Sequence, residues 1–172
     1  YFVYSVIALF IFTLVYSAGL KKEPIVDIII IGINFVIRAI AGAFAVNVKI
    51  SPWLVACTFF LALLLASTKR KGEIELLGKK SEQKLPLKYY KGFVDNIINT
   101  SATILIISYT LYSFIEHSQI FMVTLPVFVY GVFSFMLISW RKDNIARNPH
   151  LVFREKNFVW SGVIFFILLM VI

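Results

Sequence analysis

The feature that constrains this chain most is a series of long apolar stretches that carry almost no charge. A helix needs about 20 apolar residues to cross the ~30 Å hydrocarbon core of a bilayer. Six stretches of about this kind cover residues 1–20, 25–48, 50–68, 94–115, 118–140 and 158–172. The chain is 60% hydrophobic and 15% charged, whereas soluble domains are about 45–50% apolar and about 25% charged. The sequence therefore predicts one all-α domain, a polytopic membrane bundle with six transmembrane helices.

The basic residues predict how these helices are oriented. The connections at 21–24, 69–93 and 141–157 hold two, eight and five Lys or Arg residues, which is 15 of the 17 in the chain. Short cytoplasmic loops retain such residues, so we expect these connections on the cytoplasmic side of a plasma or inner membrane. Basic residues confined to loops also argue against a nucleic-acid partner, which requires them on one folded face. Topology and contact with anionic lipid explain most of these lysines.

Three ionisable residues, Asp27, Arg38 and Asp95, lie within the predicted spans. Each costs about 3 kcal/mol there unless it faces a partner or a water-filled cavity. Asp27, Asn34 and Arg38 are seven and four residues apart, so they form one polar stripe on a helix. Asp95 begins a polar stretch where a carboxylate also stabilises a helix N-terminus. The pattern indicates either a cavity open to the cytoplasm or a structural stripe in which Arg38 pairs with a neighbouring helix.

A charged segment, Lys-Arg-Lys-Gly-Glu, follows the third apolar stretch at residues 69–73. If the helix continues, Glu73 lies four residues after Lys69 and three residues after Arg70, so the three side chains share one face. Cationic side chains beside a carboxylate suit a phosphate-rich ligand with a bound divalent cation. Basic residues that extend to the membrane surface, with one surface ion pair, explain the segment equally well.

Several short motifs, taken in order, resemble one group of membrane enzymes. They are Tyr-Ser-Ala-Gly-Leu-Lys-Lys-Glu-Pro-Ile-Val-Asp at 16–27, Arg-Ala-Ile-Ala-Gly at 38–42, Ser-Pro-Trp at 51–53, Lys-Arg-x-x-Glu at 69–73, and Asn-Pro at 148–149 before Arg-Glu-Lys at 154–156. Over nearly the whole chain this series is similar to the polyprenyl-phosphate phosphoribosyltransferase branch of the UbiA-type prenyltransferase superfamily. The resemblance implies a nine-helix fold, with its active site facing the cytoplasm, of which the six helices here are the last six.

The resemblance also implies an activity and a cofactor. It implies transfer of 5-phosphoribosyl from phosphoribosyl pyrophosphate to a polyprenyl phosphate, with release of pyrophosphate. Members of the superfamily bind diphosphate through Mg²⁺ held by an Asn-Asp-x-x-Asp type motif, which this sequence lacks. We expect that motif upstream of Tyr1, and we expect the chain to be N-terminally incomplete and inactive alone.

The resemblance implies a role for each of nine residues. Phosphate or diphosphate binding is assigned to Lys21, Arg38, Lys69 and Arg70, ribose or supporting contacts to Tyr16, Asp27, Asn34 and Asp95, and metal binding or orientation of Arg70 to Glu73. A tyrosine at a membrane interface is the plainer interpretation of Tyr16. The polyprenyl tail is expected in an apolar groove between helices, lined by some of the 17 Phe residues.

Two other functions stay open. A UbiA-type prenyltransferase acting on an aromatic or other small acceptor predicts an Asp-x-x-x-Asp pair after the third helix, but Glu73 is followed four residues later by Leu77. A non-enzymatic lipid carrier or transporter predicts a polar path through the bilayer. The ionisable residues instead gather toward one end, with Arg38 the deepest.

Overall fold

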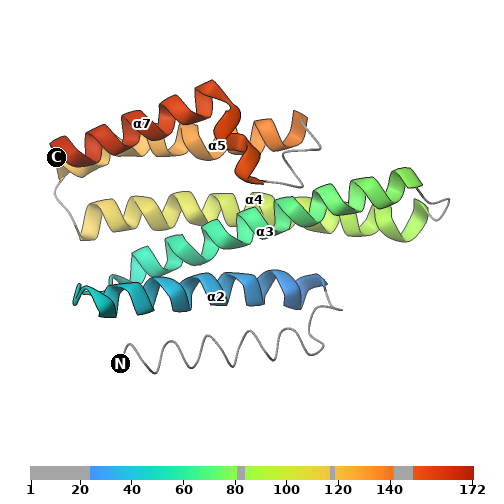
Figure 1. Ribbon diagram of the computed structural model, residues 1–172, viewed down its shortest axis with the longest axis horizontal. Coiled ribbons are helices and arrows are strands. Elements are labelled where there is room, and N and C mark those ends of the chain that lie inside the picture. Colours follow the sequence, from blue (N-terminus) through green and yellow to red (C-terminus); the bar gives the residue numbers. More distant parts are fainter. Residues whose placement is uncertain (1–23, 81–83, 117–118, 142–148) are drawn as a thin grey trace.

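The computed structural model describes residues 24–80, 84–116, 119–141 and 149–172, and these form helices and short connections without a strand. The α-helices are α2 (Pro24–Ala45), α3 (Pro52–Lys80), α4 (Lys84–Ile115), α5 (Leu125–Arg141) and α7 (Lys156–Val171), and the 3₁₀ helices are η2 (Gln119–Thr124) and η3 (Pro149–Arg154). The long helices lie side by side, with α3 and α4 between α2 and the pair α5 and α7 (Figure 1). The predicted all-α bundle is confirmed for the described part of the chain.

Local sequence explains where these helices begin and end. Pro24 and Pro52 are the first residues of α2 and α3, a position that suits proline because its missing N–H has no helical partner. Asn47 has a left-handed backbone with φ 55°, and the N–H of Val48 donates to the carbonyl of Ala43 at 3.0 Å. This turn is typical of a helix C-terminus. It ends α2 three residues before the predicted limit at 48.

The predicted loop over 69–93 is wrong, because most of it is helical. α3 continues from the membrane span to Lys80, and α4 already begins at Lys84. Lys, Arg and Glu are good helix formers, so the charge that ends an apolar stretch does not end the helix. The predicted loop over 141–157 likewise contains η3 and the start of α7. The span predicted over 118–140 begins with η2 before α5.

Within the described ranges, four helices are long and apolar enough to cross a membrane. Their spanning segments are Ile25–Ala45, Pro52–Glu75, Gly92–Ile115 and Ile120–Arg141. The apolar helix α7 has 16 residues, fewer than the ~20 that a straight crossing needs. The helix predicted over 1–20 lies outside the described residues. The chain is therefore a multi-pass membrane protein with four spans of full length in its described part, and the six-helix count and nine-helix fold stay predictions.

Helix α3 is at the centre of two apolar clusters. On one side Leu64 belongs to the larger cluster, which also includes Val94 and Leu105 of α4. On the other side Leu63 packs with Ile28 of α2. Since successive helical residues point about 100° apart, neighbouring positions on α3 contact different helices. This arrangement continues into the charged residues at the end of the span.

Candidate functional site

Arg70 joins two helices at one end of the bundle. Its Nη2 pairs with Oδ2 of Asp27 in the first turn of α2, and its Nη1 donates to Oε2 of Glu73 at 2.9 Å. The Asp27 side chain is 9% exposed and the Arg70 side chain 29%. A planar guanidinium offers five donors in a fixed geometry, so Arg70 can hold both carboxylates and still have donors left on its exposed part.

Lys71, the next residue, makes the corresponding contact on the other side of α3. Its Nζ lies 2.7 Å from Oδ1 of Asp95 on α4 and 5.2 Å from the ring centroid of Trp140 on α5. The Lys71 side chain is 7% exposed, whereas that of Asp95 is 33% exposed. An ammonium within about 6 Å of an indole ring gains a cation–π attraction. Lys71 therefore connects three helices and is itself nearly inaccessible.

We call these five residues, Asp27, Arg70, Lys71, Glu73 and Asp95, the charged end of the bundle. They place two cations and three carboxylates around one turn of α3. The opposite charges orient each other's side chains. Such a set suits an anionic ligand with hydroxyl groups, because the partly exposed Arg70 offers donors to phosphate and the carboxylates accept hydrogen bonds.

The structure brings together four of the nine predicted site residues and separates others. Asp27, Arg70, Glu73 and Asp95 gather at the charged end. Lys69 is exposed on the same turn of α3. Lys21 and Tyr16 lie outside the described residues.

Arg38 and Asn34 lie deeper along α2. Eleven residues separate Arg38 from Asp27, which at 1.5 Å per residue is about 16 Å along the helix. Arg38 is exposed, and its guanidinium carbon lies 5.8 Å from the ring centroid of Phe35. Oδ1 of Asn34 is buried and has no hydrogen-bond partner among the described residues. The deeper part of the polar stripe, Asn34 and Arg38, therefore does not converge with Arg70 in one phosphate site, although its first member, Asp27, pairs with Arg70.

The carboxylates of the charged end are paired with cations. Asp27 and Glu73 each place one oxygen on Arg70, and Asp95 places one on Lys71. No group of three or more His, Cys, Asp or Glu side chains that could hold a metal ion occurs within the described ranges. The metal role of Glu73 and the magnesium motif expected upstream of Tyr1 stay predictions.

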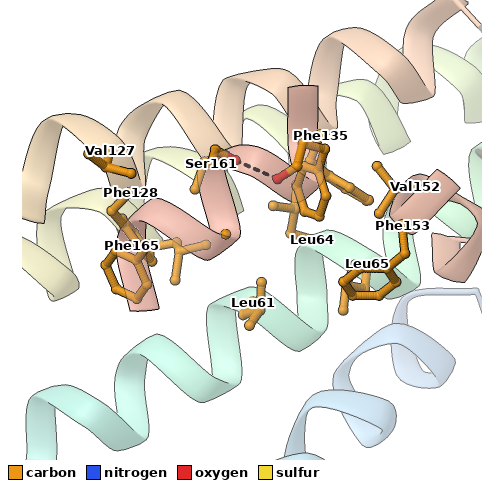
Figure 2. A pocket seen from close by; sticks show the side chains of 15 residues that line it. Leu61, Leu64, Leu65, Val127, Phe128, Phe135, Val152, Phe153, Ser161 and Phe165 are labelled. Atoms are coloured by element: carbon orange, nitrogen blue, oxygen red, sulfur yellow. Dashed lines mark hydrogen bonds between the residues drawn. The ribbon is translucent and has the colours of Figure 1, made fainter. Parts of the chain in front are cut away.

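An apolar cavity of about 480 Å³ lies among α3, α4, α5, η3 and α7 (Figure 2). Its lining includes Leu61, Leu64 and Leu65 of α3 and Phe128, Phe135, Phe153, Phe158 and Phe165 from the later elements. Ser161 also lines it, but its Oγ donates to the Phe158 carbonyl at 2.7 Å. With that hydroxyl occupied, the wall offers hydrocarbon surface, which suits a branched lipid chain.

The sequence reasoning missed two residues of this site, Lys71 and Trp140. A signal for Lys71 was present, because it is seven residues after Leu64 and so continues the face of α3 that packs on α4. A lysine on a buried face requires a partner. Trp140 has no comparable signal, since a tryptophan at the end of a span is expected at the membrane interface.

Comparison with known proteins agrees with this architecture. The sequence profile of the UbiA prenyltransferase family matches residues 1–170. A protein named decaprenyl-phosphate phosphoribosyltransferase from Mycolicibacterium smegmatis is 34% identical over 104 residues, which is 59% of this chain and 32% of that protein. One of the same name from Corynebacterium glutamicum is 33% identical over 102 residues, 58% of this chain and 30% of that protein. The chain thus matches about a third of the length of these relatives.

Proposed function

Because the chain belongs to the UbiA prenyltransferase family, we propose that it is part of a membrane transferase that moves 5-phosphoribosyl from phosphoribosyl pyrophosphate to a polyprenyl phosphate. The observation that carries the proposal is the charged end beside an apolar cavity, which together suit a phosphate-bearing donor and a phosphate-headed lipid. The names of the similar proteins support the same branch of the family. In this proposal the site faces the cytoplasm, as the basic connections indicate.

In the proposed reaction the bond from C1 of the ribose to the pyrophosphate oxygen breaks, and a bond from C1 to an oxygen of the lipid phosphate forms. The lipid phosphate is already anionic, so it needs no strong base. Arg70 and Lys69 bind the diphosphate and stabilise the charge that it gains as it leaves. The Asp95 carboxylate lies where it can accept hydrogen bonds from ribose hydroxyls. Positioning and electrostatics therefore supply the catalysis from this part of the chain.

The apolar cavity is the proposed site for the polyprenyl tail. Leu65 lines it and precedes Lys71 by six residues, which corresponds to about 9 Å along α3. A lipid whose chain occupies the cavity therefore has its phosphate near the charged end. Hydrocarbon burial contributes about 0.8 kcal/mol per CH₂ group, so the cavity provides affinity while the charged end provides orientation.

The alternative family chemistry, prenyl transfer to a small aromatic acceptor, favours carboxylates free to bind metal after the third helix. Here Glu73 is bound by Arg70 instead. Cations at this position favour a ligand that brings a 5-phosphate as well as a diphosphate.

A transfer assay with the full-length protein in detergent, in which the donor and the acceptor are varied, tests the proposal. We expect label from ribose-labelled phosphoribosyl pyrophosphate to enter the lipid fraction only with polyprenyl phosphate present, with one pyrophosphate released per lipid labelled. Transfer from a prenyl diphosphate to an aromatic acceptor, with no labelled lipid, would support the alternative chemistry. Binding of polyprenyl phosphate without pyrophosphate release would indicate a carrier, and either result overturns the proposal.

A further inference from the structure

We propose that Lys71 is a positioning residue of the donor site, which holds the Asp95 carboxylate toward the ribose hydroxyls of the donor while Trp140 covers the ammonium. This inference rests on the proposed function and adds to it a residue that touches no substrate. It assigns the ribose contact to Asp95 of α4, held in place by Lys71 of α3, separately from phosphate binding at Arg70.

The difference in exposure within the pair sets the roles of its two members. The Lys71 side chain is 7% exposed and that of Asp95 33%, with 2.7 Å between Nζ and Oδ1. The carboxylate is therefore the accessible member of the pair, and the ammonium is the buried one. A ligand can contact Asp95 directly, and Lys71 acts on that ligand through Asp95.

Trp140 explains how a lysine is held at this place. Its ring centroid lies 5.2 Å from Nζ of Lys71, and the indole comes from α5, a third helix. Lysine has a flexible four-carbon chain and a point-like charge, so one contact alone leaves its head group free to move. A carboxylate on one side and an aromatic face on the other limit that movement and fix the direction of Asp95.

The chemistry of Asp95 suits a sugar better than a phosphate. An ionised carboxylate only accepts hydrogen bonds, and a ribose offers two neighbouring hydroxyl donors. A phosphate offers acceptors and negative charge, which a carboxylate repels. Arg70, with 29% of its side chain exposed, instead offers donors to the phosphates one residue away on α3. The two neighbouring cations thus have different tasks, since Arg70 contacts the donor and Lys71 orients the residue that does.

Steady-state kinetics of the full-length protein with Lys71→Met tests the role. Methionine keeps most of the unbranched side chain and removes the charge. We expect the KM for phosphoribosyl pyrophosphate to rise at least about tenfold, the effect of losing one charge-assisted hydrogen bond, with a smaller change in kcat and in the KM for the lipid. Lys71→Arg is expected to recover part of the loss. The matched control is Lys49→Met, at an exposed lysine beyond the far end of α2, which is expected to leave both KM values unchanged.

The double variant Lys71→Met with Asp95→Asn separates positioning from a purely structural role. It leaves no uncompensated charge, so both hypotheses expect thermal stability to recover toward that of the unmodified protein. A structural pair also predicts recovery of the donor KM, whereas we expect that KM to stay raised. Normal kinetics in the double variant would overturn the inference and leave the proposed function intact.

Trp140→Leu provides an independent measurement, with Trp160→Leu on α7 as its control because both indoles are largely exposed. We expect a raised donor KM for Trp140→Leu alone. Equal kinetics for the two variants would contradict the covering role of Trp140. Absence of any phosphoribosyl transfer by the unmodified protein would overturn the proposed function and, with it, the role given to Lys71.

Discussion

Asp27 and Arg70 are 43 residues apart in the chain and form an ion pair that joins the first turn of α2 to the end of the span in α3. The two helices run antiparallel, since Gly32, further along α2, lies against Phe59, which comes earlier in α3. Asp27, a charged residue within a predicted membrane span, therefore also connects α2 to α3.

Removing the charge of Asp27 should weaken this connection. We expect Asp27→Asn to lower the free energy of unfolding by about 1.5–3 kcal/mol, the usual contribution of a hydrogen bond to a charged group. Thermal unfolding of the full-length protein in detergent measures the change. An unchanged melting temperature for Asp27→Asn would show that the pair does not stabilise the bundle.

Gly32 should accept a larger side chain poorly. A Cβ at this position would lie 2.8 Å from Cε2 of Phe59 and 3.3 Å from Cδ2 of Leu63. We expect Gly32→Val to destabilise the protein by about 1–3 kcal/mol, as overpacking does. The control is Gly42→Val in the same helix, where nothing lies within 4 Å of the added Cβ. Equal melting temperatures for the two variants would contradict the close α2–α3 contact.

The apolar stretches predicted the positions of the main helices well, and their ends less well. The stretch over 25–48 became Pro24–Ala45, because the left-handed turn at Asn47 ends it. Hydropathy reports where a helix can lie in lipid, and α3 continues to Lys80 after its apolar part has ended. Loss of hydropathy therefore marks the end of the apolar part of α3 and not the end of the helix.

The candidate site was predictable only in part, for a related reason. Spacing within one helix predicted that Arg70 and Glu73 share a face, and they form an ion pair. The partners Asp27 and Asp95 come from other helices, and a single sequence does not specify which faces of two helices meet. The polar stripe of α2 shows that a shared helix face does not make a shared site. Arg38 lies on the same face as Asp27 but about 16 Å further along the helix.

Filling the apolar cavity should weaken lipid binding without harm to the fold. Gly162 lines the cavity, and nothing lies within 4 Å of a Cβ added there. We expect Gly162→Leu to raise the KM for polyprenyl phosphate at least about tenfold, since displacing two CH₂ groups costs about 1.6 kcal/mol. The donor KM and melting temperature should be unchanged. Gly42→Leu, at an open position outside the cavity, is the control. Equal lipid KM values for both variants would exclude the cavity as the tail site.

Arg38 should matter less for the donor than Arg70 does. Direct phosphate contacts require about 3 Å between heavy atoms, and Arg38 lies about 16 Å along α2 from the Asp27–Arg70 pair. We expect Arg38→Met to leave the KM for phosphoribosyl pyrophosphate within about threefold of the unmodified value, well below the tenfold loss of a charged hydrogen bond. A donor KM as high as that of Arg70→Ala would mean that the stripe of α2 contributes to the same site.

The most direct measurement is the rate at which the full-length protein transfers the ribose-labelled phosphoribosyl group to polyprenyl phosphate, compared among the unmodified protein, Arg70→Ala and Lys69→Ala. Lys49→Ala, at an exposed lysine outside the charged end, is the control. We expect labelled lipid from the unmodified protein and from Lys49→Ala, and a loss of at least about tenfold in the other two variants, because each removes a cation that binds the diphosphate. Undiminished transfer by both Arg70→Ala and Lys69→Ala would contradict phosphoribosyl transfer at the charged end.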